Sequence, residues 1–354
     1  MFMATHSSRS RIPHPTLKDV AALAGVSSGL ASMALRGVNG PSENTRRMVL
    51  AAAEELQYRG NATASLLARE HPRLLGVTCF LDRDLDADIV DHLYVEAERL
   101  GYELVIGATT PSHSLQASLE MLAANSCEAI IAVGPQNPEE CLSKISSRIP
   151  VLAIGAIPEN RQGVSSVHID DRLAMKLAVD HLVKLGHTDI CHVTGGSGYS
   201  SSERKTGYEI AMRGAGLDKE IRIIEGGQTE EAGVEAAQVF LLGSAPTAVI
   251  AYNDACAIGA MTEARKLGYS VPDDLSVVGC DDSRASRIAY IDLTTVSQDR
   301  EDLACQALRR TLTLIKDPNS TRTEYKSAPQ LIHRSTTGPQ HNRGKQPNSC
   351  ASRE

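Results

Sequence analysis

Apolar positions follow two different spacings along the chain. In residues 16–58 they recur at helical intervals between polar residues that begin helices. From Leu74 onward, short apolar runs alternate with amphipathic segments, and the runs span 74–81, 102–108, 128–134, 150–156, 189–196, 221–227, 247–254 and 275–282. Apolar strands separated by helices predict parallel sheets covered on both faces. Two successive sets of about four such units favour two similar α/β lobes.

The first segment predicts three short helices. Thr16 and Asp19 have the spacing of a capping box, and Gly25 allows a tight turn with positive φ. Ser27 and Ser42 are expected to cap the second and third helices. The expected inward positions are Val20, Leu23 and Ala24, then Leu30, Ala31, Ala34 and Leu35, then Val49, Ala52, Ala53 and Leu56. Two short helices around a glycine turn predict a helix-turn-helix.

Charge is distributed unevenly between this segment and the rest of the chain. Residues 1–71 carry a net charge of +3, which leaves −10 for the remainder of a chain whose formal net charge is −7. A basic head on an acidic body favours DNA contact at one end. There is no apolar run of membrane-spanning length and no secretory signal, so we expect a cytoplasmic protein without membrane contact. The polar ends, residues 1–15 and 338–354, predict disordered tails.

The sequence contains no pattern that indicates enzyme or cofactor chemistry. The eight cysteines form no CxxC or Cys/His cluster, so we expect reduced thiols and no metal site. The glycine-rich segment 193–198 lacks both phosphate-binding signatures and predicts a strand-to-helix turn. An α/β enzyme would need a nucleophile or cofactor constellation. A solute-binding protein for transport would need a signal peptide and no helix-turn-helix.

The head resembles that of the lactose/galactose repressor family. The resemblance lies in TLKDVAALAGVS (16–27), SENTRR (42–47) and AEELQY (53–58). It implies a transcription regulator, not an enzyme, that binds a pseudo-palindromic operator as a homodimer, with a hinge helix over 61–69. The domains implied are a head over 16–60, a hinge and linker over 61–73, and a core over 74–337. The lobes of this core would be 74–168 with 299–326, and 169–298 with 327–337.

The resemblance also implies DNA contacts for particular residues. Thr16 belongs to this surface, and the second helix would present Ser27, Ser28, Gly29 and Ser32. Phosphate contacts would come from Thr45, Arg46, Tyr58 and Asn61. Leu67 would insert into the minor groove. Met33 stands where the family usually has a base-reading arginine, which removes a guanine contact there, and Arg36 is a candidate to compensate. Gly60 replaces the usual hinge proline.

Four segments of the body resemble the periplasmic-binding-protein-like core of the same family. They are RKTGY (204–208), NDACAIG (253–259), PDDLSVVGCDD (272–282) and LTTVSQ (293–298). The resemblance implies a small-molecule effector between the lobes, contacted by Arg204, Asn253, Asp281 and Gln298. A guanidinium, an amide and a carboxylate suit a polyhydroxylated ligand such as a sugar. Asp282 is expected to hold its own turn, and Asp254 to cap the following helix.

The first lobe departs from the family pattern. Segment 81–93 lacks the usual family sequence, so Asp82 and Asp88 are only candidate ligand contacts. Tyr199 or Tyr252 could provide a stacking surface, because the chain has no Trp and three Phe. Nucleosides, amino acids and phosphorylated metabolites therefore remain alternatives to a sugar.

Overall fold

The computed structural model describes residues 15–35, 38, 40–58, 72–136, 138–156, 164–242 and 244–340. The chain divides into two compact units, Met1–Pro72 and Arg73–Glu354. Three of the expected DNA contacts, Arg36, Asn61 and Leu67, lie outside the described residues together with the expected hinge helix. Most of both expected tails, 1–14 and 341–354, also lies outside them.

The head contains the three helices that the sequence predicts: α1 (Leu17–Leu23), α2 (Ser28–Leu35) and α3 (Glu43–Glu55). The Thr16 hydroxyl accepts from Asp19 N, and Asp19 Oδ2 accepts from Thr16 N at 2.7 Å, which completes the capping box. Gly25 turns the chain with φ of 66°. Ser27 Oγ accepts from Leu30 N at 3.2 Å, and Ser42 Oγ accepts from Thr45 N at 3.2 Å. Local capping therefore sets the helix boundaries.

Small side chains fill the core of the head. Its buried residues are Val20, Ala21, Ala24, Ala31, Ala34, Val49, Ala52 and Ala53. Leu23 was expected on the inward face but is 47% exposed. Successive helix positions are rotated by about 100°, so a face centred between Val20 and Ala21 turns Leu23 outward. Leu35 and Leu56 pack half-buried against this cluster, and Leu30 is also half-buried.

The first lobe of the larger unit is a six-stranded parallel sheet in the order β11-β5-β4-β3-β1-β2. Its strands are β1 (Leu74–Phe80), β2 (Glu103–Thr109), β3 (Ala129–Val133), β4 (Val151–Ile154), β5 (Val164–Ile169) and β11 (Glu324–Ser327). Val77 of β1 is opposite Ile106 of β2 and Ile131 of β3, so branched apolar side chains fill adjacent strands. The accompanying helices are α5 (Asp84–Arg99), α6 (Leu115–Ala124), α7 (Glu139–Ser146) and α12 (Arg300–Lys316).

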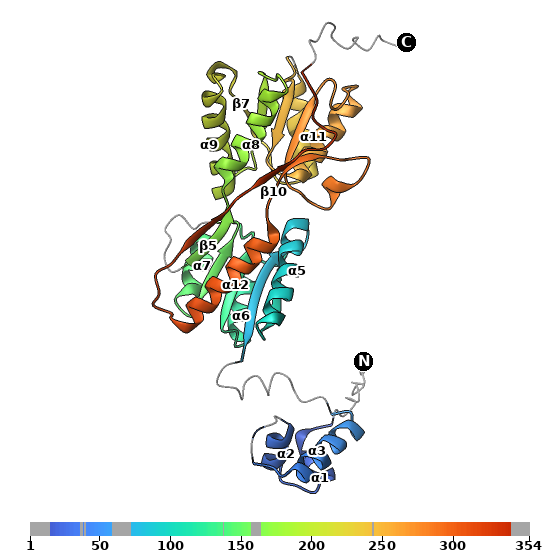
Figure 1. Cartoon of the computed structure of the whole chain (residues 1–354), viewed down its shortest axis with the longest axis vertical. Coiled ribbons are helices and arrows are strands. Elements are labelled where there is room, and N and C mark those ends of the chain that lie inside the picture. Colours follow the sequence, from blue (N-terminus) through green and yellow to red (C-terminus); the bar gives the residue numbers. More distant parts are fainter. Residues whose placement is uncertain are drawn as a thin grey trace, which may run out of the picture. The chain divides into compact units, whose positions relative to one another are not determined.

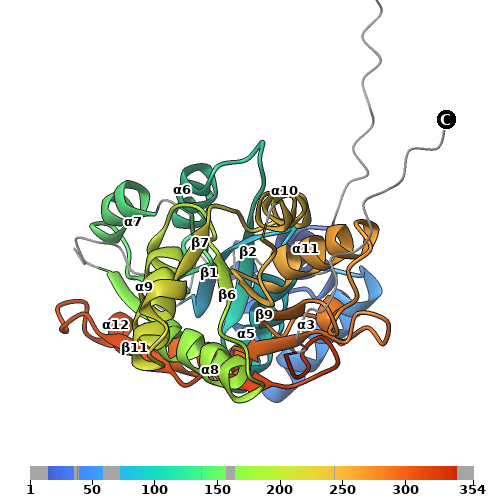
Figure 2. The same cartoon turned by 90° about the horizontal axis from the view of Figure 1, so that it is seen from above.

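The second lobe repeats this arrangement with the order β12-β10-β9-β8-β6-β7, in which β12 alone is antiparallel to its neighbour. Its strands are β6 (Ile190–Val193), β7 (Arg222–Ile224), β8 (Ala248–Ala251), β9 (Ser276–Asp281), β10 (Thr294–Ser297) and β12 (Gln330–Ile332). Its helices are α8 (Asp171–Lys184), α9 (Tyr199–Gly214), α10 (Glu230–Leu241) and α11 (Asp254–Lys266), with short 3₁₀ turns at Asp218–Glu220 and Ala285–Arg287. Helices surround the strands of the core (Figure 2).

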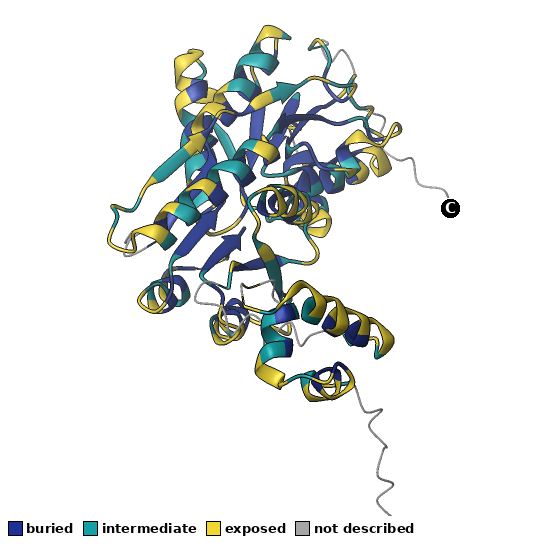
Figure 3. Cartoon of the chain, turned by 60° about the horizontal axis from the view of Figure 1, so that its bottom comes forward, coloured by how far each residue is buried: buried dark blue, intermediate teal, exposed yellow. Residues whose placement is uncertain are grey.

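The chain passes between the two sheets after β5, after β10 and after β11, within the residues described. These crossings lie side by side at the waist of the core (Figure 1). The central strands are almost wholly buried, the edge strands β2, β7, β11 and β12 are partly exposed, and the helices expose their outer faces (Figure 3). In the part of the chain that the structure covers, no helix has the length and apolar character to cross a membrane.

Four strands carry no apolar run and were not predicted: β5, β10, β11 and β12. The sequence of β5, VSSVHI, is polar at alternate and neighbouring positions, yet all six residues are buried. Ser165 Oγ accepts from Thr323 N at 3.2 Å, and the two ring nitrogens of His168 contact Ile169 O at 2.7 Å and Glu324 Oε1 at 3.1 Å. Two of these partners, Thr323 and Glu324, lie far away in the sequence, so periodicity alone could not identify the strand.

Candidate functional site

A cavity of about 960 Å³ opens between the two lobes of the core. Its lining includes Phe80 at the end of β1, Gly134 just after β3 and Asp281 at the end of β9. Carboxyl ends of strands from both parallel sheets therefore meet there, as expected for ligand sites in open α/β sheets. The expected contacts Arg204, Asn253, Asp281 and Gln298 all line this cavity, and so does Asp82.

Arg204 lies on α9 in a buried ion pair. A Cβ at Gly207 would lie 2.7 Å from Arg172 Cα, so glycine at this position lets α9 approach α8 closely. This approach brings Arg204 Nε within 2.7 Å of Asp171 Oδ1, and both side chains are at most 4% exposed. Nη1 of Arg204 donates to Tyr252 O, and its guanidinium stacks on the Tyr252 ring at 4.6 Å. Arg204 therefore braces three elements of the second lobe while it borders the cavity.

Asp281 and Gln298 form a polar pair at the cavity wall. Gln298 Nε2 donates to Asp281 Oδ1 at 2.6 Å, and Arg300 Nη2 donates to Asp281 O at 2.7 Å. Burial raises the pKa of Asp281, although the nearby guanidinium of Arg204 opposes the rise. Asp282 turns away and accepts from Arg287 Nη2 at 2.7 Å, so it anchors its own loop as the sequence predicted.

Asn253 is the N-cap of α11, not Asp254 as expected from the sequence. Its Oδ1 accepts from Cys256 N at 2.9 Å, and its Nδ2 donates to Gln228 O at 2.9 Å. The assignment to Asp254 is wrong because its side chain turns inward after the cap. Asn253 thus connects α11 to the segment before α10 and borders the cavity with the rest of its surface.

The Asp254 carboxylate is buried against the next strand ends. It is 1% exposed and accepts from Ser283 N at 2.7 Å and from Thr295 Oγ1 at 2.6 Å. Burial raises its pKa to about 7, and the charge of Asp281 contributes to the rise. The Asp254 carboxyl is therefore a buried acid with neutral donors in a cavity wall.

In the first lobe, the two aspartates that the sequence indicated as candidate ligand contacts lie in different surroundings. Asp82 is exposed and lines the cavity. Asp88 is not part of the lining, because its carboxylate forms ion pairs with Arg284 Nη2 at 2.6 Å and Arg300 Nε at 3.2 Å. The candidate assignment of Asp88 as a ligand contact is therefore replaced: this residue connects α5 to the second lobe.

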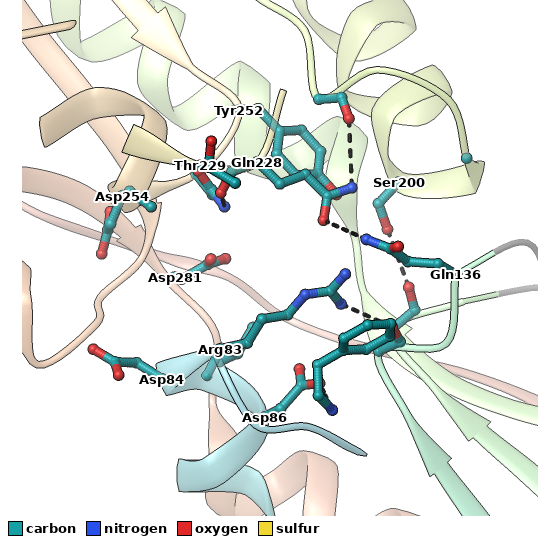
Figure 4. Close-up of a pocket in the computed structure, with 18 of the residues that line it drawn as sticks. Arg83, Asp84, Asp86, Gln136, Ser200, Gln228, Thr229, Tyr252, Asp254 and Asp281 are labelled. Carbon is teal, nitrogen blue, oxygen red and sulfur yellow. Dashed lines mark hydrogen bonds between the residues drawn. The ribbon is translucent and has the colours of Figure 1, made fainter. Parts of the chain in front are cut away.

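Sequence reasoning missed several residues that line the cavity. Asp86 is 3% exposed, accepts from Phe80 N at 3.0 Å, and has its pKa raised by burial to about 7. Arg83 stacks over Phe80 at 4.4 Å and donates to Gly134 O at 2.8 Å. Gln136 reaches the second lobe, where its Nε2 donates to Gln228 Oε1 at 3.4 Å (Figure 4). The cluster of acids in segment 82–88 was the available signal, but it did not show which side chains face inward.

Both tyrosines named as stacking surfaces border the cavity. The ring of Tyr252 is covered on one side by Arg204. Tyr199 packs edge-on against His168, with ring centroids 5.6 Å apart. Each ring therefore already has one packing partner, and both half-buried tyrosines contribute to the wall.

The head places most of its expected DNA contacts on its surface. Thr16, Ser27, Ser28 and Gly29 are exposed, whereas Ser32, Met33, Thr45, Arg46 and Tyr58 are half-buried. Arg46 Nη2 donates to Val38 O at 3.1 Å, which holds the loop before α3. Tyr58 packs against the alanine-rich core. The first turn of α2 is therefore the part of this surface whose side chains contribute least to packing within the head.

Two known families match this chain. Residues 16–61 match the bacterial regulatory proteins of the lacI family, and residues 179–337 match a periplasmic binding protein-like domain. The transcriptional regulator GalR of Escherichia coli is 31% identical over 331 residues, which cover 90% of this chain and 94% of GalR. The chain belongs to the lacI family. It is a transcriptional regulator, not an enzyme, with a helix-turn-helix DNA-binding head and an effector-binding core.

Two further relatives extend the match. The repressor PurR of Vibrio campbellii is 29% identical, with 91% of this chain and 98% of PurR covered. A crystal structure of the lac repressor dimer, bound to operator and the anti-inducer ONPF, is 27% identical with a TM-score of 0.80, and covers 92% of this chain and all of that one. Matches of this length include both the head and the core, so the fold predicted from the sequence is confirmed.

Proposed function

We propose that this regulator binds a pseudo-palindromic operator as a homodimer and that a small polyhydroxylated effector, such as a sugar, controls its affinity. The observation that carries the proposal is one chain with both an exposed α2 N-terminus and a polar cavity between two lobes. The lac repressor structure, by its title, is a dimer on operator with a ligand bound. Because its partner is chromosomal DNA, we assign the protein to the cytoplasm.

The first turn of α2 supports DNA contact by this helix. Ser28 and Gly29 are exposed, and this turn contains no acidic residue that would repel phosphates. Free N–H groups at a helix start favour phosphate oxygens. The half-buried Met33 supplies no hydrogen-bond donor, so we propose that base recognition relies on Ser27, Ser28 and Ser32. Thr16, Thr45, Arg46 and Tyr58 would position the head on the backbone, and Arg36, Asn61 and Leu67 stay predictions.

A charge insertion tests this surface without disturbing the helix. Glu in the first turn favours a helix dipole, so Ser28→Glu should fold normally while its carboxylate repels phosphate. Starting from duplexes selected out of a random pool, we expect operator affinity to fall at least about tenfold in a mobility-shift assay. Thr321→Glu, in an exposed core loop, makes the same change of charge and is the control. Equal affinities for the two variants would contradict the proposed DNA surface.

The lobes support the effector part of the proposal. Arg204, Asn253, Asp281, Gln298 and Asp82 border one cavity from both sides, so a bound molecule touches both lobes. A ligand that binds one lobe arrangement more tightly shifts the population toward it. We expect a ligand found by thermal shift on the full chain to change operator affinity by about fivefold to a hundredfold or more. A ligand that binds but leaves operator affinity unchanged would contradict allosteric control.

The homodimer has a separate test. Two heads on one operator require two chains, and α5 exposes apolar side chains at Tyr94 and Val95 that would suit a protein contact. Light scattering of the full chain should give the mass of a dimer. A monomer that binds operator with full affinity would contradict this part of the proposal.

A further inference from the structure

The cavity lining is strongly acidic. Among the described residues, eight aspartate and glutamate side chains line it against two arginines. Three of these carboxylates come from the segment at the start of α5, and five come from the second lobe. Charge of one sign in a concave site raises the local concentration of ligands of the opposite sign. The balance of charge therefore bears on which effectors can enter.

Both guanidinium groups already have acidic neighbours. Arg204 pairs with Asp171 at 2.7 Å and lies 3.9 Å from Asp281 Oδ1, so one cation serves two carboxylates. Arg83 interacts electrostatically with Asp86 and lowers the pKa of that buried carboxyl against the effect of burial. Each arginine that lines the cavity therefore already has an acidic side chain as an electrostatic partner.

The other carboxylates meet only neutral donors or solvent. Asp254 accepts from a backbone N–H and a threonine hydroxyl. Asp84, at the first turn of α5, is exposed on the opposite lobe. Figure 4 shows Asp84, Asp254 and Asp281 around the same opening, while Arg83 extends toward Gln136. Asp84, Asp254 and Asp281, from α5, α11 and β9, therefore border one opening in which the described acidic side chains outnumber the guanidinium groups.

A second, independent observation concerns Asp171. This residue borders the cavity and is 3% exposed, and its Oδ1 is bonded to Arg204. Its Oδ2 is buried with no hydrogen-bond partner among the described residues. A buried carboxylate oxygen without a donor is costly, so the wall of this site lacks a donor.

We propose that the effector is a cation, a polyhydroxylated compound with a protonated amine that lies between the first-lobe and second-lobe carboxylates. An ammonium group supplies three donors and no acceptor, which matches acceptor-rich walls. A phosphorylated or carboxylated ligand would meet more acidic than basic side chains in this cavity, which costs affinity. A neutral sugar would leave the repulsion among the carboxylates in place. This inference rests on the proposed effector site, and it specifies the charge of its ligand.

Matched ligands test the inference on the full chain. The probes are glucosamine, galactosamine and mannosamine, then the parent hexoses, then their 6-phosphates, each at one common concentration. We expect the largest rise in Tm with an amino sugar and binding at least about tenfold tighter than its parent hexose in calorimetry. A larger rise with any hexose or hexose phosphate overturns the inference, and so does the absence of any rise with the three amino sugars.

Charge-neutralising variants separate electrostatics from shape. Asp84→Asn removes one exposed carboxylate at the opening, and it should weaken the amino sugar about threefold to tenfold while its effect on the parent hexose stays within twofold. Asp273→Asn removes an exposed carboxylate outside the lining and is the matched control. Equal effects of the two variants on the amino sugar would overturn the inference.

The mobility-shift assay distinguishes failure of this inference from failure of the proposed function. If a hexose or a hexose phosphate changes operator affinity and no amino sugar does, the regulator is effector-controlled and the inference of a cation is wrong. If the full chain selects no duplex from the random pool, the proposed function itself fails.

Discussion

The two lobes contribute polar side chains to one cavity, but these side chains differ in how firmly each lobe holds them. In the second lobe, Arg204 and Asp281 are held by hydrogen bonds or ion pairs to their own lobe. In the first lobe, Asp82 and Asp84 are exposed at the opening. One wall is therefore fixed before a ligand arrives, and the other presents charge on side chains that can still move.

This difference indicates how the two lobes divide recognition. Fixed donors and acceptors cost little to order on binding, so they suit selection of ligand shape. The lobes also touch directly, because Ser200 Oγ donates to Gly155 O at 3.3 Å and Arg284 Nη2 lies 2.6 Å from Asp88 Oδ1. These two contacts are partly exposed, whereas Arg300 of α12 donates to Asp281 O at 2.7 Å from a largely buried position. Substitutions in the two walls can test whether the second-lobe side chains are held in place while the exposed first-lobe side chains are free to adapt.

The largest effect is expected at Arg204. Arg204→Ala would leave Asp171 buried without its cation, and breaking such a pair costs about 3–5 kcal/mol of unfolding free energy. Arg172→Ala is the control, because its pair with Glu203 has the same kind of geometry at 2.8 Å but an arginine that is 53% exposed. An exposed pair contributes at most about 1 kcal/mol. Equal losses in urea unfolding would mean that the second-lobe wall is not specially braced.

Asp86 should make stability depend on pH. Burial raises its folded-state pKa to about 7, above its ordinary pKa of 3.8, which the unfolded chain retains. Its contribution to stability is therefore full below about pH 4 and is lost as the pH rises through about 7. Asp86→Asn keeps an acceptor for Phe80 N and removes the charge. As the pH rises across this window, we expect the unfolding free energy of the variant to exceed that of the wild type, by on the order of 2–4 kcal/mol at pH 8.

Urea unfolding at pH 5 and pH 8 measures this difference. Asp91→Asn, at an exposed position of the same helix, is the control and should show no such gain. If Asp86→Asn were no more stable than the wild type at pH 8, the carboxyl would be ionised at little cost, and the buried part of the first-lobe wall would be as accessible as its rim.

A smaller effect is expected at the contact between the lobes. Arg284 is 68% exposed, and Asp88 retains Arg300 when Arg284 is removed. Arg284→Ala should therefore lower the unfolding free energy by less than about 1 kcal/mol. Urea unfolding is again the measurement. A loss of unfolding free energy as large as that of Arg204→Ala would show that the lobes depend on each other for stability. This result would contradict the proposed difference between the two walls.

The smallest effect on stability is expected at Asp84. It is exposed at the first turn of α5, so Asp84→Ala should change the unfolding free energy by no more than about 0.5 kcal/mol. The same variant should weaken a cationic ligand, so stability and binding separate at this position. A large loss of stability in thermal unfolding would place Asp84 among the braced residues.

The sequence by itself determined the features that depend on near neighbours. The capping residues Thr16, Ser27 and Ser42 and the turn at Gly25 were predicted correctly, because a cap involves groups only a few residues apart. The eight apolar runs correspond to β1–β4 and β6–β9 for the same reason, since a buried parallel strand is apolar over its own length. The motifs of the body likewise identified side chains that meet at one cavity.

The tertiary structure alone decided which side chains are partners there. Asp171 is 33 residues from Arg204, and Asp88 meets Arg284 from the other lobe, so no local pattern relates them. Asp86 and Asp88 are two residues apart on α5, yet one lies in the cavity wall and the other in an ion pair outside it. Periodicity records that a helix has an inner face. Only the convergence of strand ends from two sheets determines whether a carboxylate on that face meets a cation, a hydroxyl or the space for a ligand.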